Sequence, residues 1–133
     1  MNNPGCYTLA ALGITTALTS SAQTAIEDLE GMTAVSLEAA WAWGSGGTSV
    51  VAVVQVSSDG GNNWRDVARF DFGAAAAVKY ANLSGLTPKG ITAYAALSAE
   101  GVTDGLLGKS LRCVITSVGT FVNSTLSIRA TVR

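Results

Sequence analysis

The side chains that could do chemistry in this chain are few, because its 133 residues contain no histidine. Histidine is the commonest general base and a common metal ligand, so its absence excludes Ser-His-Asp and Cys-His triads and His-ligated zinc sites. Glu27, Asp28 and Glu30 could bind a cation together, but they lack the alternating spacing of a calcium loop and indicate a solvated acidic turn. The sequence therefore predicts a protein that is not an enzyme and uses no metal and no cofactor.

Cys6 and Cys113 are the only two cysteines, 107 positions apart. They could form one disulfide that ties the first strand to a late one, or they could be two small apolar residues packed in the core. Two sulfurs without CxxC spacing or histidine cannot form a closed zinc site. Of the two alternatives, we expect reduced and buried thiols.

The three tryptophans, Trp41, Trp43 and Trp64, could form a flat platform on which a sugar ring stacks. In the alternating run 33–43, however, Trp41 and Trp43 lie on the same face as Val35 and Leu37. That shared face predicts packing in the core rather than an exposed binding platform.

The charged residues are sorted by sign between the two halves of the chain. Residues 1–64 hold five acids and no Lys or Arg, a net charge of −5, whereas residues 65–133 hold eight basic residues and four acids, a net charge of +4. Such halves can pair within one chain, or head to tail between copies. The basic residues Arg65, Arg69 and Lys79 are scattered among acids, so we expect no nucleic-acid partner. No uncharged apolar stretch reaches 18 residues, so we also expect no membrane partner.

The segment Ser57-Ser58-Asp59-Gly60-Gly61-Asn62-Asn63-Trp64 is typical of a braced hairpin. The Asp59 carboxylate can accept hydrogen bonds from its own turn, Gly60 and Gly61 tolerate positive φ, and Trp64 can pack beneath the turn. The pattern S-x-D-x-G-x-x-W resembles the Asp-box hairpin that is repeated around sialidase propellers, away from their active sites. Here it occurs once in a chain too short for a propeller, so the resemblance implies a braced hairpin and not glycosidase activity.

Alternation of apolar and polar residues dominates the rest of the chain and predicts strands. The runs cover residues 7–19, 33–43, 49–57, 64–72, 76–83, 111–118 and 125–133. In the run 64–72, alternation places Asp66 on the same face as Ala68, Phe70 and Phe72. With Gly-rich turns between them, about seven or eight short strands predict one all-β domain over residues 1–133, an antiparallel β-sandwich or jelly roll.

Two segments do not follow this pattern. Residues 22–31 predict either a short helical turn or a strand that ends in an acidic loop. Residues 84–110 form a long irregular arm, and such an insertion in a small domain is usually functional or disordered. The arm can fold over its own domain or dock on a neighbour, and its apolar residues make it the candidate interaction segment: Ile91, Tyr94, Leu97, Val102, Leu106 and Leu107.

Five segments follow one another in a distinctive order over most of residues 29–133. They are Leu29-Glu30-Gly31-Met32-Thr33 before a Trp-bearing strand; Gly44-Ser45-Gly46-Gly47-Thr48; Val54-Gln55-Val56-Ser57-Ser58-Asp59-Gly60-Gly61 with Trp64-Arg65-Asp66-Val67-Ala68; Asp104-Gly105-Leu106-Leu107-Gly108-Lys109-Ser110-Leu111-Arg112; and Thr116-Ser117-Val118-Gly119-Thr120 before a Leu/Ile/Arg strand. This order resembles a family of small virion proteins encoded in the structural gene clusters of tailed phages and prophages.

The resemblance implies a non-enzymatic coat or connector protein of the virion, assembled in the cytoplasm of a bacterial host. Within that family, the first expectation is a minor capsid protein that decorates the shell, as trimers seated on the major capsid protein where capsomers meet. The alternatives are a structural protein of the neck or tail, or a carbohydrate-binding β-sandwich module.

Overall fold

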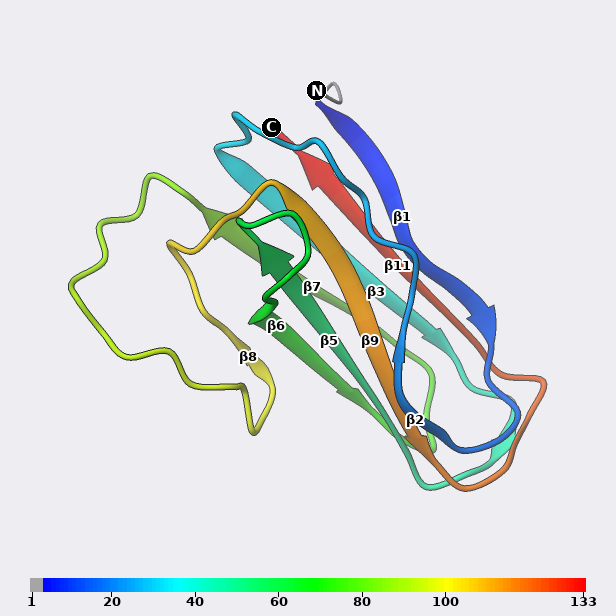
Figure 1. Ribbon diagram of the computed structural model, residues 1–133. Coiled ribbons are helices and arrows are strands. Elements are labelled where there is room, and N and C mark those ends of the chain that lie inside the picture. Colours follow the sequence, from blue (N-terminus) through cyan, green and yellow to red (C-terminus); the bar gives the residue numbers. More distant parts are fainter. Residues whose placement is uncertain (1–3) are drawn as a thin grey trace.

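Eight strands of five or more residues form two antiparallel sheets in residues 4–133, the part of the chain that the computed structural model describes (Figure 1). The long strands are β1 (Gly5–Gly13), β2 (Leu18–Ala22), β3 (Ala34–Ala42), β5 (Ser49–Ser57), β6 (Arg65–Phe72), β7 (Ala77–Ser84), β9 (Ser110–Val118) and β11 (Thr125–Val132). Three further strands of two residues each are β4 (Ser45–Gly46), β8 (Gly101–Val102) and β10 (Phe121–Val122). The all-β prediction is confirmed, and the short extra strands were missed because two residues show no alternation.

The long strands pair as one hairpin that has been rolled up. The first pairs with the last (β1 with β11), the second with the second-last (β2 with β9), then β3 with β7, and β5 with β6 at the tip. The resulting sheets have the orders β1-β11-β3-β7 and β2-β9-β5-β6-β8, and they pack face to face. This nested pairing is the jelly-roll arrangement, so the predicted fold class is confirmed.

The inner faces of the two sheets form the core, as period-two alternation predicts. In β3 the inward residues Val35, Leu37, Ala39 and Trp41 are all buried. The Trp41 ring meets the Phe121 ring edge-on, with 5.3 Å between centroids, and its Nε1–H donates to the Gly73 carbonyl oxygen at 2.9 Å. Edge-to-face packing and a satisfied ring N–H are what a deeply buried tryptophan requires.

The N-terminal region differs from its prediction in two ways. The run 7–19 is not one strand, because the chain leaves the first sheet after Gly13, buries Ile14 and enters the second sheet at Leu18. Residues 22–31 contain no helix. After β2 the chain continues beside β9, where Ile26 and Leu111 exchange backbone hydrogen bonds of 2.8 and 2.9 Å, so the alternative of a strand ending in an acidic loop is confirmed.

A β-bulge overturns the predicted direction of Asp66. In the pairing of β5 with β6, Val54 faces Ala68 and Gln55 faces Asp66, which leaves Val67 as an extra residue. The extra residue shifts the alternation by one position, so Asp66 joins the outer face of the sheet instead of the core face. Ala68, Phe70 and Phe72 keep their predicted inward places.

The two cysteines do not share an environment. Both are free, but Cys6 is exposed on the outer face of β1, opposite Thr131, and only Cys113 is buried. The expectation of two buried thiols is therefore wrong for Cys6. Burial raises the pKa of the Cys113 thiol to about 12, which keeps it protonated.

Gly47 provides a test of how tightly the sandwich is closed. It has a φ of 72°, and a Cβ added there would overlap the Phe121 ring, so Gly47→Ala should lower the free energy of unfolding by about 2–5 kcal/mol. Gly60 is the matched control, because its φ is 76° but nothing lies within 4 Å of an added Cβ. Gly60→Ala should cost only about 1–2 kcal/mol in urea unfolding. Equal losses for the two variants would contradict this packing.

Candidate functional site

The Asp59 turn closes the tip of the rolled hairpin between β5 and β6. The Asp59 carboxylate accepts hydrogen bonds from Asn63 Nδ2 at 2.6 Å, from the Asn63 backbone N–H at 2.9 Å and from Ser57 Oγ at 2.8 Å. The Ser57 hydroxyl in turn accepts the Gly61 N–H at 2.9 Å. These bonds, those from Asn63 first, lower the pKa of Asp59 to about 2.

Trp64 ends this turn, far from the other two tryptophans. The Arg112 guanidinium lies 4.3 Å from the centroid of the Trp64 ring and covers one of its faces. Trp41 is buried. Trp43 Nε1–H donates to the Gly46 carbonyl, which lies before β5, whereas Trp64 lies after the turn at the other end of that strand. A nine-residue strand is roughly 30 Å long, so Trp43 and Trp64 are far apart. The three rings therefore form no common platform for a sugar.

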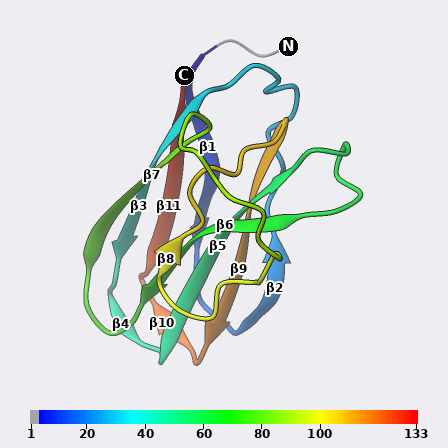
Figure 2. The same cartoon turned by 90° about the vertical axis from the view of Figure 1, so that its left-hand side faces the viewer.

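The arm, residues 84–110, leaves the end of β7 and swings away from the sandwich before it returns through β8 (Figure 1). Seen from the side, it passes in front of β5 and β6 (Figure 2). Its ends are held together by Asp104, whose carboxylate accepts the Ser84 N–H at 2.7 Å and the Gly105 N–H at 2.9 Å. These bonds also lower the pKa of Asp104. Long loops in small domains are often used in function.

Asp66 anchors the middle of the arm. Its buried carboxylate accepts the Leu97 N–H at 3.1 Å and Gln55 Nε2 at 2.8 Å, while its own N–H donates to the Tyr94 hydroxyl at 2.9 Å. The bulge in β6 makes these contacts possible, because it directs the carboxylate outward toward the arm.

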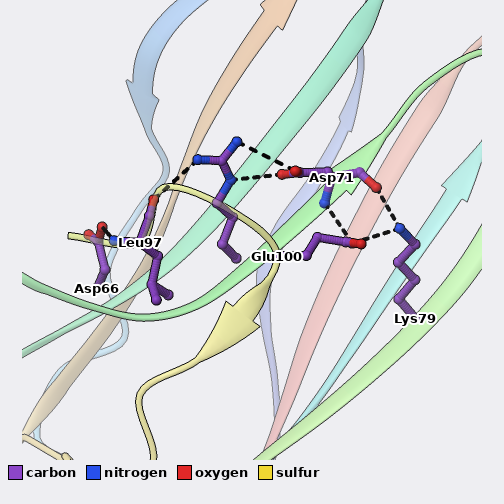
Figure 3. A network of polar contacts seen from close by, with 6 residues as sticks. Asp66, Asp71, Lys79, Leu97 and Glu100 are labelled. Carbon is purple, nitrogen blue, oxygen red and sulfur yellow. Dashed lines mark hydrogen bonds and ion pairs between the residues drawn. The ribbon is translucent and has the colours of Figure 1, made fainter. Parts of the chain in front are cut away.

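A polar latch of four side chains joins the arm to both sheets, and we define it as Arg69, Asp71, Lys79 and Glu100 (Figure 3). Arg69 forms a salt bridge with Asp71 at 2.8 Å and donates to the Leu97 carbonyl at 3.1 Å. Glu100 accepts Lys79 Nζ at 2.6 Å and the Asp71 N–H at 2.9 Å. The bond from Lys79 is the largest cause that lowers the pKa of Glu100. Arg69 and Asp71 lie on β6, Lys79 lies on β7 and Glu100 on the arm, so the latch closes the open side of the sandwich.

The six apolar residues predicted for the arm have different fates. Leu106 and Leu107 pack against the core, and Tyr94 and Leu97 are held on β6. Val102 pairs with Ala68 as part of β8 but is 44% exposed. Only Ile91 projects with its whole side chain exposed, and Leu86 at the start of the arm is 78% exposed. The arm thus folds over its own domain and presents an apolar tip.

Between the arm and the sheet lies a groove of about 670 Å³. Residues 89–100 of the arm form most of its wall, with Arg65, Thr103 and Leu106 completing it. The Arg65 guanidinium lies 5.1 Å from the centroid of the Tyr94 ring, which fixes a positive charge on the groove wall. In residues 4–133 no group of three His, Cys, Asp or Glu residues is placed to hold a metal ion, and no helix is long and apolar enough to cross a membrane.

The latch and Asp66 were not found from the sequence. Their partners are separated by up to 31 positions, as Leu97 is from Asp66, and no local spacing indicates such contacts. Comparisons with protein-family models, curated proteins and solved structures find no match for this chain. Its function is therefore inferred from its own geometry.

Acidification tests the Asp59 turn. Because the folded pKa of Asp59 lies below its ordinary value of 3.8, the carboxylate adds stability above about pH 4 that is lost as the pH falls through about 2. Asp59→Asn should therefore lower the Tm at neutral pH, and its difference from the wild type should shrink between pH 4 and pH 2. Thermal melts of both proteins over that range measure the difference. A difference that stays constant with pH would exclude a role for the charge.

Glu100→Gln tests the latch. Loss of the carboxylate weakens the bonds to Lys79 and to the Asp71 N–H, so hydrogen exchange at the amides of Asp71 and Leu97 should accelerate. The global Tm should change little, because both partners of this exposed ion pair lie at the edge of the sandwich. Glu38→Gln, on the exposed outer face of β3, is the control and should leave exchange in the arm unchanged. Unchanged exchange in Glu100→Gln would mean that the latch does not hold the arm.

Proposed function

We propose that this protein is a non-enzymatic structural component of a tailed-phage virion, a capsid decoration protein that binds the major capsid protein. The observation that carries the proposal is the arm, which is held at its ends by Asp104 and farther along by Asp66 and the latch, while its tip exposes Ile91. A rigid loop with an apolar tip is suited to insertion into a neighbour, since little ordering entropy is lost when it binds.

The fold is compatible with this role. Jelly rolls recur in viral capsid domains and also in lectins, so the fold alone does not choose between them. The lectin alternative has little support from the tryptophans, because Trp41 is buried and Trp43 and Trp64 lie at opposite ends of β5.

The outer face of the β1-β11-β3-β7 sheet also supports packing against other subunits. Its outward residues are mostly Ala, Ser and Thr, and Glu38 and Arg129 are its charged residues within the strands. Val78 and Tyr80 on the edge strand β7 lie on the same face and are 55% and 72% exposed, respectively. Depletion of charge and enrichment of tyrosine are features of interface cores.

The test is the composition of purified phage particles from the strain that carries the gene. Mass spectrometry should detect the protein in stoichiometric amounts, and its absence would reject the proposal. Copy number separates the two virion locations, because a decoration protein accompanies the many capsomers whereas a neck or tail protein is present in few copies.

Ile91→Asp tests the arm in the same particles. A charge on the tip cannot be buried without a partner, so the variant should be lost from particles or greatly depleted. Its fold should be unaffected, because the Ile91 side chain is fully exposed. Ala74→Asp, at an exposed position in the turn between β6 and β7, is the control and should remain in the particles. Full incorporation of Ile91→Asp would show that the tip is not the binding element.

A further inference from the structure

The groove beneath the arm has a positively charged wall. Arg65 and Lys89 both line it and are exposed, and neither forms a salt bridge with another described residue. Glu100 also lines the groove but accepts from Lys79, and Asp59 accepts from Asn63. Asp104 accepts from Ser84, and the charge of Lys89 is a minor cause that lowers its pKa. The groove therefore offers positive charge together with the small side chains of Ala93, Ala95 and Ala96.

Elsewhere on the same molecule lies an exposed segment whose negative charge is opposite to that of Arg65 and Lys89. We define it as the acidic turn, residues 26–31. Backbone hydrogen bonds fix it at two points, between Ile26 and Leu111 and from the Leu29 N–H to the Lys109 carbonyl at 2.8 Å. Leu29 is buried, whereas Asp28 and Glu30 on either side of it are exposed and form no salt bridge with a described residue. The acids are thus held outward in a fixed geometry before any partner binds.

The acidic turn cannot reach the groove of its own chain. It lies beside β9 on the side of β2, whereas residues 89–100 of the arm, which line the groove, lie beyond β6 (Figure 1). Ile26, Leu111, Val56 and Arg65 lie in one row across the sheet, so about three strand spacings, roughly 14 Å, separate the acidic turn from the Arg65 backbone. Hydrogen bonds hold both elements in place, so the two charged surfaces of one copy stay apart.

We infer that the groove beneath the arm binds the acidic turn of a second copy of this chain, so that copies join head to tail. The contact places Asp28 and Glu30 of one copy against Arg65 and Lys89 of the next, so the first copy still has a free groove and the next copy still has a free turn. A heterologous contact of this kind closes into a ring when the rotation between copies fits, and otherwise continues as a filament. The trimer implied by the resemblance to virion proteins would be such a ring.

The inference goes beyond the proposed function and does not rest on it. Its test uses purified protein, whereas the virion proposal is tested in particles, so either can fail while the other stands. Sedimentation velocity of the wild type at low salt and neutral pH should show a closed oligomer that dissociates as the salt concentration rises. A monomer at every protein concentration would overturn the inference.

Charge exchange tests the contact itself. Arg65→Glu with Lys89→Glu should weaken association by about tenfold or more, and Asp28→Asn with Glu30→Lys should do the same. Asparagine is chosen at position 28 because Asp28 has a φ of 57°, which asparagine tolerates. The protein that carries all four changes should associate more strongly than either double variant, because its groove is acidic while Asp28→Asn removes a negative charge from its turn and Glu30→Lys adds a positive one. Association of either double variant at wild-type strength would overturn the inference.

Failure to fold is excluded by two controls. Each variant should keep the wild-type Tm within a few degrees, since the four residues are exposed. Glu38→Lys with Arg129→Glu makes a comparable exchange on the outer face of the other sheet and should leave association unchanged. The inference would be overturned if this control lost association and the four-change protein did not regain it. Those two results together would place the interface on the other sheet.

Discussion

Every long-range pairing in this protein depends on the register of one hairpin, β5 with β6. The other antiparallel pairs are nested around this tip, β3 with β7, β2 with β9 and finally β1 with β11, so a shift of register at the tip has to be absorbed by the pairs outside it. The tip joins residues close in sequence, whereas the last pairing joins Gly5 to Val132. Since closing longer loops costs more entropy, the braced turn at Asp59 is the least costly place for pairing to begin.

Rolling the hairpin into two sheets leaves the edge strands β7 and β8 beside each other on the open side of the sandwich, and the latch occupies this opening. Lys79 lies on the inward face of β7, paired with Ala39, and an inward-pointing charge on an edge strand discourages pairing with a foreign strand. Its bonds to Glu100 and to the Asp71 carbonyl at 2.7 Å satisfy that charge. The same bonds also hold the arm, so the latch both protects the edge strand and positions the tip of the arm.

Alternation was sufficient to predict the sandwich and the core faces of β3 and β11, because the residues of a core face share one side of a strand. The Asp59 turn was predicted from the spacing of Ser57, Asp59, Gly61 and Trp64, which are neighbours in sequence. Alternation was insufficient for Asp66, since one extra residue in β6 reverses the direction of that side chain. It also joined β1 and β2 into one strand, because the buried Ile14 at the crossing continues the apolar pattern. The latch lay beyond local reasoning altogether, since Lys79 and Glu100 meet only once the roll has closed.

The uneven charge of the two halves acquires a spatial meaning in the fold. Both salt bridges between described residues, Arg69 with Asp71 and Lys79 with Glu100, lie within the basic half and serve to hold the arm. Asp28 and Glu30 form no salt bridge with a described basic residue, because the fold places their turn across the sheet from Arg65 and Lys89. A chain that separates its charges in this way loses little folding stability, since exposed ion pairs contribute little. What it retains is a pair of complementary surfaces that only another copy can bring together.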